Sequence, residues 1–412
     1  MKNKKIIVCF TASYPYGSRE TYFENELNYL AEGFDKVYIV PLYNPYGNLN
    51  IRNTPPNVRV WDVVLPQGLT RVILGLFNGS GFGDYFSDFF SQKVYHSRFK
   101  LKKWFNSLLI YRLSVKKFRR MRKDLPKDSI LYSYWAEVPL FTSSLCDNFF
   151  KLTRMHGADF YLDRNKGFLP IRQAIYNSSD YLLPISRDIQ HLLREHYNLS
   201  PEKVRLSYLG VINRTHNCTI YFGNILKIVS CSHVYPLKRV HLILDALNQV
   251  NPNILIEWHH IGDGESMPQL KRYITEHANK NINVTLHGQM AQEDLIEIYQ
   301  KNYFHWFVNV STHEGLPVTI MECFSFGIPA IGTDVGGVNE IINEKNGYLI
   351  DRDFSMKELA RLLERFKSPC YVNKRKHAYE TWYNSFNADT NYTQLVNFIH
   401  ELVPECLEGY NV

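Results

Sequence analysis

The sequence predicts an α/β protein with two doubly wound domains, each built on a parallel sheet, that face one another across a cleft. Short apolar runs alternate with amphipathic stretches along the 412 residues, which is the pattern of strands joined by crossover helices. This alternation restarts at Leu226–Ser230, after the polar and turn-rich residues 212–224. Because 412 residues exceed one ordinary domain, the restart predicts a second domain.

The first domain is predicted over residues 1–213 as a Rossmann-like unit. A helix that contains Glu20, Phe23, Leu27 and Leu30 should follow the first strand. Ser186 is the expected N-cap of a later helix, because its hydroxyl can accept a hydrogen bond from the first helical turn. The expected strands and the capped helix are Lys5–Phe10, Val37–Val40, Ser129–Tyr132, Tyr181–Ile185 and the helix Asp188–His196.

The second domain is predicted over residues 224–385 as another Rossmann-like unit, and residues 386–412 form a terminal helix centred on Tyr392–Leu402. Its expected strands are Leu226–Ser230, Ile254–Ile261, Asn283–Leu286 and Phe304–Val310. Its expected helices are Val240–Val250, Met267–Ala278, Glu293–Lys301 and Thr319–Phe326. Open α/β sheets bind ligands at the carboxyl ends of their strands, so candidate site residues are sought in the loops that follow strands.

Composition places the chain among ordinary globular proteins, with 45% hydrophobic and 21% charged residues. The seven cysteines are scattered and form no Cys-x-x-Cys, which favours buried thiols in a reducing compartment over disulfides or a zinc site. The apolar run Ile6–Ala12 is too short for a signal peptide, and no run approaches the roughly 18 apolar residues of a membrane span. We therefore expect a cytoplasmic protein.

The segment Arg98–Lys123 holds eleven lysines and arginines and no acidic residue, in a chain whose net charge is +7. Apolar residues such as Phe99, Trp104 and Phe118 interleave with these cations. The segment is either a surface helix with solvated cations or a contact with the anionic inner face of the cell membrane. Nucleic-acid binding would need further support, and the rest of the sequence gives none, so no nucleic-acid partner is expected.

The stretch Ser311–Gly337 contains two carboxylates, Glu314 and Glu322, in an apolar setting. A strand before it and a helix after it would place Gly315, Leu316, Pro317, Val318 and Thr319 at a helix N-terminus. Unpaired N–H groups there attract phosphate. Glu314 would lie beside the anion, and Glu322 could accept hydrogen bonds from vicinal hydroxyls, which together predict a nucleotide-sugar pocket. The alternative is that Glu314 is a solvated loop residue and Glu322 pairs with a lysine.

The segment "HEGLPVTIMECFSFGIPAIGTDVGGVNEII" (His313–Ile342) resembles the E-x7-E element of retaining glycosyltransferases of the GT-B fold, in family 4 (glycosyl transferases group 1). Weaker similarity extends over most of the chain, in the segments Arg154–Tyr161, Asp180–Ser186, Val204–Val211, Ser230–Leu247, His259–Leu270 and Val284–Tyr299. The resemblance implies that residues 1–213 bind the acceptor and residues 224–385 bind the nucleotide sugar. It also implies that residues 386–412 return to the first domain.

For the second domain, the resemblance implies a catalytic Glu314 on the donor sugar's hydroxyls and Glu322 on the ribose hydroxyls. Lys238 would stabilise the negative charge that grows on the leaving diphosphate, while Thr319 and the neighbouring amides hold it. His233 stands near a position where the family usually has arginine, so either His233 contributes a hydrogen bond or Arg239 replaces that arginine. Further expected donor contacts are Gly262 in a Gly-Asp-Gly turn and Gly288 and Gln289 near the nucleobase.

In the first domain, His156 matches a histidine that the family places against the donor sugar. Asp159 is either an acceptor-side residue or a helix cap. Gly17, in the turn Tyr14–Arg19, is expected to face the cleft and to contact acceptor or phosphate.

The resemblance implies a sugar transfer that retains anomeric configuration, onto a glycan or lipid-linked acceptor of a bacterial surface polysaccharide such as lipopolysaccharide, O-antigen or capsule. The resemblance implies no metal, and no other cofactor is expected. Two alternatives stay open. One is a sugar-nucleotide 2-epimerase or hydrolase of the same fold, and the other is a non-catalytic nucleotide-sugar-binding subunit.

Overall fold

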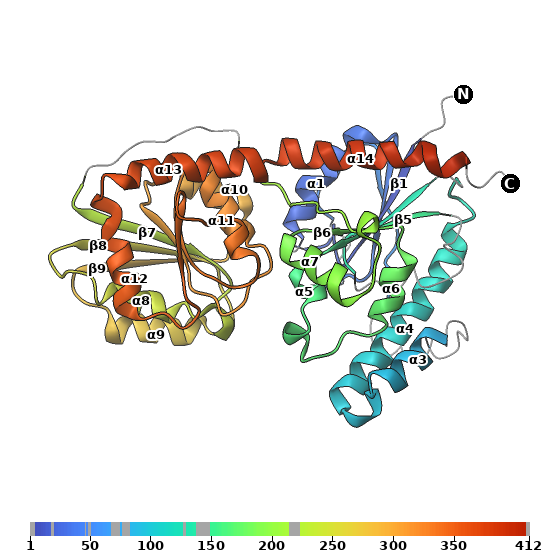
Figure 1. Ribbon diagram of the computed structural model, residues 1–412, viewed down its shortest axis with the longest axis horizontal. Helices are drawn as coiled ribbons and strands as arrows, with labels where there is room; N and C mark the ends of the chain where they lie inside the picture. Colours follow the sequence, from blue (N-terminus) through green and yellow to red (C-terminus); the bar gives the residue numbers. More distant parts are fainter. Residues whose placement is uncertain are drawn as a thin grey trace. The chain divides into compact units, whose positions relative to one another are not determined.

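The computed structural model describes residues 5–17, 20–45, 47, 51–66, 75, 83–126, 129–136, 149–213 and 223–408, without the side chains of 403–408. The chain divides into two compact units (Figure 1). Unit 1 comprises Met1–Tyr208 with Tyr392–Val412, and unit 2 comprises Leu209–Asn391. Both units are α/β and doubly wound, which confirms the predicted fold class. Of the predicted linker, residues 214–222 lie outside the described residues.

Unit 1 is built on a six-stranded parallel sheet in the order β3-β2-β1-β4-β5-β6. Helices follow the strands on both faces, so the central strands are buried throughout and are almost continuously apolar. The strands are β1 (Ile6–Thr11), β2 (Lys36–Pro41), β3 (Val58–Val60), β4 (Ile130–Ser133), β5 (Phe150–Met155) and β6 (Tyr181–Pro184). All four strands predicted for the first half are present.

The helices of unit 1 include α7 (Arg187–His196), where Ser186 caps the first turn as predicted: its hydroxyl accepts from Ile189 N–H over 3.2 Å. Glu20 was expected inside the first helix, but it lies one residue before α1 (Thr21–Gly33), in the left-handed region at φ 58°. Its carboxylate instead binds backbone amides, as described below. The other helices are α3 (Gly83–Ser91), α4 (Arg98–Met121), α5 (Gly157–Phe160) and α6 (Arg172–Ser178), with the 3₁₀ turn η1 (Val94–His96) between α3 and α4.

The terminal helix α14 (Ala388–Glu408) starts among the residues of unit 2 and continues into unit 1 (Figure 1). Its apolar side chains enter the same core as Ile7 of β1 and Leu30 of α1. The residues that α14 contributes to this core are Leu395, Val396, Phe398, Ile399 and Leu402. The core of unit 1 therefore includes side chains of a helix near the C-terminal end of the sequence.

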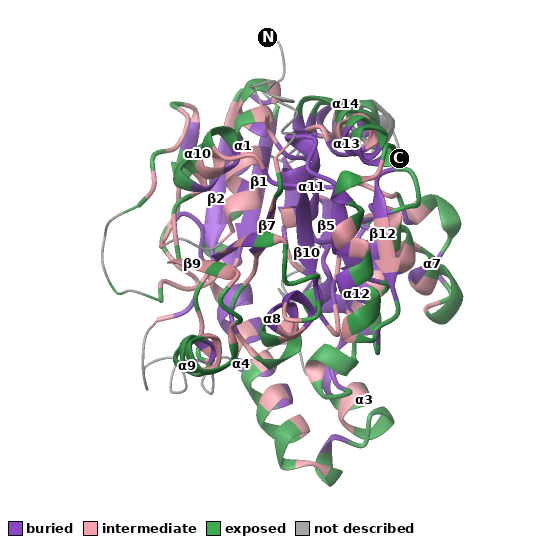
Figure 2. Ribbon diagram, turned by 90° about the vertical axis from the view of Figure 1, so that its left-hand side faces the viewer, coloured by how far each residue is buried: buried purple, intermediate pink, exposed green. Residues whose placement is uncertain are grey.

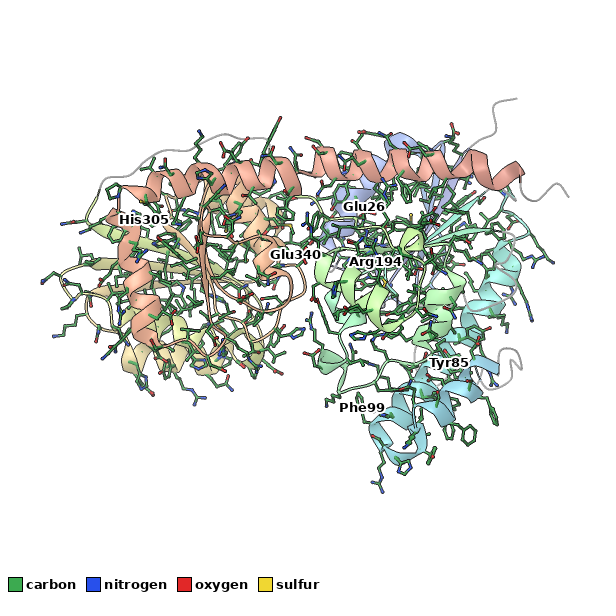
Figure 3. The ribbon with its side chains drawn as sticks, in the orientation of Figure 1. Glu26, Tyr85, Phe99, Arg194, His305 and Glu340 are labelled. Carbon is green, nitrogen blue, oxygen red and sulfur yellow. The ribbon has the colours of Figure 1, made fainter. Side chains whose placement is uncertain are left out.

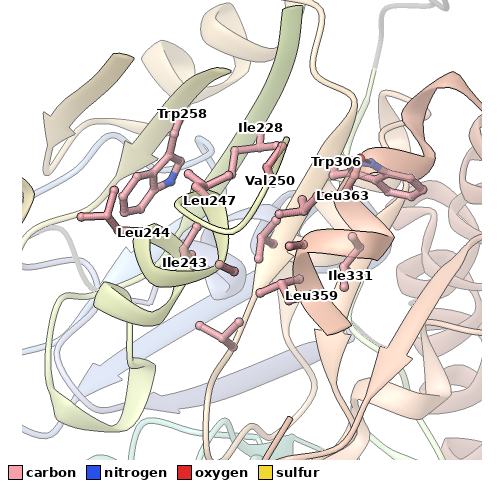
Figure 4. Packing of buried hydrophobic residues seen from close by; sticks show 14 of the residues in the cluster. Ile228, Ile243, Leu244, Leu247, Val250, Trp258, Trp306, Ile331, Leu359 and Leu363 are labelled. Atoms are coloured by element: carbon pink, nitrogen blue, oxygen red, sulfur yellow. Dashed lines mark hydrogen bonds between the residues drawn. The ribbon is translucent and has the colours of Figure 1, made fainter. Parts of the chain in front are cut away.

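Unit 2 repeats the same topology, with a parallel sheet in the order β12-β11-β10-β7-β8-β9. Two buried tryptophans anchor its core (Figure 4): Trp258 Nε1 donates to Ser230 Oγ over 2.9 Å, and Trp306 Nε1 donates to Leu363 O over 3.0 Å. The strands are β7 (Ile225–Cys231), β8 (Leu255–Ile261), β9 (Ile282–Gly288), β10 (Trp306–Asn309), β11 (Ala330–Thr333) and β12 (Gly347–Ile350). The helices are α8 (His241–Leu247), α9 (Met267–His277), α10 (Gln292–Lys301), α11 (Val318–Ser325), α12 (Met356–Leu363) and α13 (Cys370–Thr381), with the short 3₁₀ turn η6 (Pro236–Lys238).

The predicted basic segment forms α4 and the turn that follows it. Its second half behaves as a packed surface helix, because Leu108, Leu113 and Phe118 are buried. Its first turns differ: Phe99, Leu101 and Phe105 are exposed among the cations (Figures 2 and 3). In the described part of the chain, no helix combines the length and the apolar character that a membrane span requires.

Candidate active site

The topology of unit 2 predicts where a ligand binds. In an open sheet of this order, ligands lie outside the carboxyl ends of the strands at the switch point, where the two halves of the sheet diverge. In unit 2 the switch point falls between the paired strands β7 and β10. The loop after β7 carries Lys238, and the loop after β10 carries Glu314.

The loop between β10 and α11 is held in one conformation by short polar contacts. Asn309, at the end of β10, donates from its side-chain amide to Glu314 Oε1 over 3.0 Å and accepts from Ser311 N–H over 3.0 Å. Gly337 N–H donates to Gly315 O over 2.7 Å. A Cβ at Gly336 would lie 2.0 Å from Glu314 O, so the backbone approaches here at a distance that only glycine permits.

Glu314 is buried, with 7% of its surface exposed, and Lys238 Nζ lies 2.5 Å from its Oε1. Burial opposes ionisation of Glu314. The Lys238 charge and the hydrogen bonds from Lys238, Ser311 and Asn309 outweigh burial and hold the pKa of Glu314 below its usual value. Glu314 is therefore an ionised, fixed acceptor, and the alternative of a solvated loop residue is wrong.

Glu322 lies one turn into α11 and is 5% exposed. Its Oε1 accepts from Gln292 Nε2 over 2.7 Å, and among the described residues no lysine or arginine pairs with it. Burial raises the pKa of Glu322 to about 7, although the Gln292 hydrogen bond opposes the shift. A buried carboxylate whose partner is neutral is suited to accept hydrogen bonds from the hydroxyl groups of a ligand.

The N-terminus of α11 presents donors beside this carboxylate. Within the described residues, the N–H groups of Leu316, Val318 and Thr319 donate to no protein acceptor. Pro317 precedes the first helical residue, and Gly315 and Thr319 remain partly exposed. Free N–H groups at a helix N-terminus favour an anion such as phosphate.

The turns after β7, β8 and β9 meet at Gly262. Its N–H donates to Gly288 O over 2.8 Å, and a Cβ at Gly262 would lie 2.0 Å from Ser232 O. His233 is exposed, with Nδ1 3.3 Å from Asp263 O, and Gln289 is exposed beyond Gly288. These residues border the carboxyl ends of neighbouring strands, as their positions in the sequence predict.

Arg239 lies in the same loop as Lys238, but its guanidinium is engaged within the fold. Its Nε donates to Val310 O and its Nη2 donates to Arg352 O, each over 2.8 Å. Arg239 thus ties η6 to β10 and to the loop after β12. Of the two cations, Lys238 is the one that contacts a site carboxylate.

In unit 1, His156 follows β5 and is buried, with neither ring nitrogen hydrogen-bonded within the described residues. Its ring lies 4.3 Å from the Trp135 ring at an interplanar angle of 35°, and 4.8 Å from the Tyr134 ring. Buried polar nitrogens without partners are unfavourable unless water or a ligand binds them. His156 is therefore oriented by stacking while both nitrogens remain available.

Asp159 acts as a cap. Its Oδ1 accepts from His156 N–H and its Oδ2 accepts from Ala136 N–H, each over 2.7 Å. Both oxygens thus fix the loop around His156, which favours the capping alternative over an acceptor contact.

The switch point of unit 1, between β1 and β4, holds two residues that the sequence reasoning did not identify, Glu20 and Trp135. The Glu20 carboxylate accepts from Ser13 N–H and Tyr14 N–H, each over 2.7 Å, and from Ala12 N–H over 3.0 Å. It also accepts from Trp135 Nε1 over 2.6 Å. The sequence signal for this site was a tryptophan two residues after the buried strand β4, which ends at Ser133. Gly17 lies in the same turn at φ 71°, and Ser18 and Arg19 lie outside the described residues.

Within the described residues, no three histidine, cysteine, aspartate or glutamate side chains group as metal ligands would. The structure thus brings Lys238, Glu314, Glu322 and the α11 N-terminus together in unit 2. In unit 1 it groups His156 with Trp135 and Glu20.

Part of the chain matches a known protein family. Residues 223–381 match the model of the family described as "Glycosyl transferases group 1". The chain is 23% identical over 205 residues to the putative colanic acid biosynthesis glycosyltransferase WcaL of Salmonella typhimurium, a match that covers 48% of this chain and 50% of WcaL. The chain spans about half the length, or less, of the curated relatives it matches.

Two solved structures share the fold over nearly the whole chain. The lipopolysaccharide outer core galactosyltransferase WaaB, in its apo form, has a TM-score of 0.66 at 18% identity, covering 95% of this chain and 98% of WaaB. Alr3699/HepE of Anabaena, in complex with UDP and glucose, has a TM-score of 0.65 at 14% identity, covering 96% and 99%. The chain therefore has the two-sheet α/β fold of the GT-B glycosyltransferases, and its residues 223–381 match the glycosyl transferases group 1 family.

Proposed function

We propose that the chain is a retaining glycosyltransferase of family 4, which moves a sugar from a nucleotide-diphosphate sugar to an acceptor glycan without a metal ion. One observation carries this proposal: the ionised, buried Glu314 is paired with Lys238 beside the free N–H groups of α11. A fixed acceptor for sugar hydroxyls next to a cation and helix donors for a diphosphate is the combination that a nucleotide sugar requires.

In this proposal each group has one role. The α11 amides and Thr319 hold the diphosphate, and Glu322 accepts hydrogen bonds from the ribose hydroxyls. The Lys238 ammonium has three N–H donors, so it can keep its contact with Glu314 while it also binds phosphate oxygen. His156 contributes a hydrogen bond to the donor sugar from unit 1.

The reaction breaks the bond between the anomeric carbon and the diphosphate oxygen. The same carbon bonds to an acceptor hydroxyl oxygen on the same face, and the hydroxyl proton passes to the leaving diphosphate. Negative charge grows on the diphosphate during this step. Lys238 therefore stabilises the transition state more than the bound donor, which lowers the barrier.

The proposed acceptor is a lipid-linked bacterial surface polysaccharide, reached from the cytoplasmic face of the membrane. The relative WcaL is named as a putative glycosyltransferase of colanic acid biosynthesis. On α3 and α4 of this chain, Phe86, Phe90 and Phe99 are exposed, and Lys103 Nζ lies 6.0 Å from the centre of the Phe99 ring. Aromatic side chains beside cations suit the interface of an anionic membrane.

The test is a thermal-shift panel of UDP-, GDP-, ADP- and CDP-sugars, followed by NMR of the product with the donor that binds. A donor at a hundred times its dissociation constant adds about 2.7 kcal/mol to the free energy of unfolding. We expect one nucleotide to stabilise the protein, less so in Glu322→Ala, and the product to keep the donor's anomeric configuration. Epimer or free sugar formed equally well without acceptor would overturn transfer in favour of an epimerase or hydrolase. Donor binding without any turnover would indicate a binding subunit.

A further inference from the structure

Unit 1 contains a cavity of about 110 Å³ that does not belong to the proposed donor site. It lies between α4, which contributes Lys103, Asn106 and Ser107, and the start of α6, which contributes Arg172. Asn106 is exposed, so the cavity reaches solvent at that side. The volume exceeds what a single water needs and accommodates a small polar group.

Arg172 is a buried cation at this cavity, with only 9% of its surface exposed. Its Nη1 donates to the Tyr197 hydroxyl over 2.8 Å and its Nη2 contacts Asp159 O at 3.4 Å. Its Nε has no acceptor, and within the described residues no carboxylate forms an ion pair with the guanidinium. A buried cation with only neutral partners is unfavourable unless a counter-charge reaches it.

The surroundings of Arg172 compensate its charge only in part. The rings of Phe160, Tyr176 and Tyr197 lie between 5.0 and 5.8 Å from the guanidinium, which is within the range of cation–π attraction. The Asp159 carboxylate also lines the cavity and offsets one positive charge there, although both of its oxygens already accept backbone N–H groups. What the guanidinium still lacks is an acceptor for its Nε–H.

Lys103 supplies a second cation at the same cavity. Its Nζ donates to Asn165 Oδ1 over 2.7 Å. The remaining lining combines the polar Asn106 and Ser107 with the apolar Ile110, Leu169 and Pro170. The two cations suit the oxygens of a phosphate, and the apolar side chains suit a hydrocarbon attached to it.

We propose that this cavity is a binding site for a phosphate group, held by Arg172 and Lys103. The site rests on the proposed function in one respect only: in a glycosyltransferase it would hold the phosphate that joins the acceptor to its lipid. Among the described residues of unit 1, the amides of Ser13 and Tyr14 also group as donors for an anion, but Glu20 already occupies them. At the cavity beside α6, in contrast, the Arg172 Nε–H has no acceptor among the described residues.

The test is calorimetric titration of the full-length protein with inorganic phosphate, butyl phosphate and acetate at constant ionic strength. The variants are Lys103→Gln and Asn106→Asp, with Lys102→Gln as the matched control. Lys102 precedes Lys103 on α4 and is exposed, but it does not line the cavity. We expect a tenfold or larger rise in the dissociation constant for phosphate in the first two variants, roughly the loss of one charge-assisted contact, and less than about a twofold change in the control.

The two phosphates distinguish the source of the group. Tighter binding of butyl phosphate supports a lipid phosphate in contact with Ile110 and Leu169, whereas equal binding supports free phosphate. No binding, or equal weakening by Lys102→Gln and Lys103→Gln, overturns the site. Donor binding in unit 2, measured in the same samples, shows that each variant is folded. It also separates the two proposals. If the cavity does not bind phosphate, binding of nucleotide sugars is unchanged, and if no nucleotide sugar binds, phosphate binding at the cavity is unchanged.

Discussion

Lys238 Nζ lies 2.5 Å from Glu314 Oε1, and this contact joins the loops that follow two neighbouring strands, β7 and β10. A second contact between the same loops reinforces the pair, because Thr312 N–H donates to Leu237 O over 2.8 Å. The candidate site of unit 2 therefore lies where these two loops contact each other, so the same residues contribute to stability and to ligand binding.

Replacing Lys238 with methionine should therefore affect both properties. Glu314 would remain buried without its cation, which costs about 1–3 kcal/mol in the free energy of unfolding. The double variant Lys238→Met/Glu314→Gln should regain part of that loss, because no buried charge is left unpaired. Urea unfolding of the two single variants and the double variant measures the coupling. Strictly additive losses would show that the pair contributes nothing as a pair.

Transfer activity gives a second readout for the same pair. Glu314→Gln keeps the side-chain shape but removes the ionised acceptor, so kcat/KM should fall about 10²–10³-fold, as for other groups that act on the transition state. Nucleotide diphosphate without sugar should bind this variant with nearly unchanged affinity, since Glu314 acts on the sugar. Equal losses in diphosphate binding and in kcat/KM would place Glu314 on the phosphates instead.

The raised pKa of Glu322 predicts a pH dependence of stability. The carboxyl releases its proton near pH 4.5 in the unfolded chain and near pH 7 in the folded protein, so stability falls as pH rises between these values. The loss amounts to at most about 3 kcal/mol, from the 1.36 kcal/mol that corresponds to each pH unit. Glu322→Gln should remove this dependence, which urea unfolding at pH 5 and pH 8 can measure. A parallel pH dependence in both proteins would contradict the prediction.

Trp135 is predicted to be a positioning residue for His156. Trp135→Phe keeps a ring against His156 but removes the Nε1–H that donates to Glu20, whereas Trp135→Ala removes the stacking as well. We expect kcat to fall about threefold in the first variant and about 30-fold or more in the second, because misplacing a reacting group is costly. The KM for the nucleotide sugar should change little. Equal effects of the two variants would show that the indole hydrogen bond, and not the stacked ring, matters.

The exposed aromatic residues of α3 and η1 are predicted to bind anionic membranes. Phe86, Phe90 and Tyr95 are 54–58% exposed, and Lys100 of α4 donates to Gln92 O, which lies between α3 and η1. Replacing all three with serine should reduce cosedimentation with phosphatidylserine vesicles about tenfold or more, since each aromatic loses apolar contact with the interface. Neutral phosphatidylcholine vesicles are the control, and binding to them should be weak for both proteins. Undiminished binding of the triple variant to the anionic vesicles would exclude these residues as the contact.

Apolar strands such as β1, β7 and β10, and the start of α7 at Ser186, could be predicted from sequence because their signals are local, whereas β3, β11 and β12 were not predicted. The strand β5 was not predicted, since its sequence FKLTRM contains Lys151 and Arg154, and charged residues rarely occupy a buried strand. Arg154 is nevertheless fully buried, because its Nη2 pairs with the equally buried Glu26 of α1 over 3.1 Å and its Nε donates to the Tyr132 hydroxyl over 2.6 Å. The local sequence pattern cannot show that the charge of Arg154 is paired with a residue 128 positions away.

The candidate site shows the same division between local and distant information. Glu314, Glu322 and the α11 N-terminus belong to one continuous segment, so a single stretch of sequence predicted them. The contact between Trp135 and Glu20 joins residues 115 positions apart. Likewise, the hydrogen bonds of Arg239 to Val310 O and Arg352 O depend on the tertiary fold. The sequence does not show these contacts, and the position of Arg239 alone therefore suggested a phosphate ligand.

The terminal helix α14 has a consequence for the order in which the protein acquires its structure during synthesis. Leu395, Ile399 and Leu402 complete the core that also contains Ile7 and Leu30, so the first unit to be translated is the last to be finished. Unit 2 carries all of its own core residues between Leu209 and Asn391 and can close first. Domains that fold as the chain emerges usually do so from the N-terminus. Here the apolar side chains of unit 1 that pack against α14 stay exposed until residues 395–402 have been synthesised.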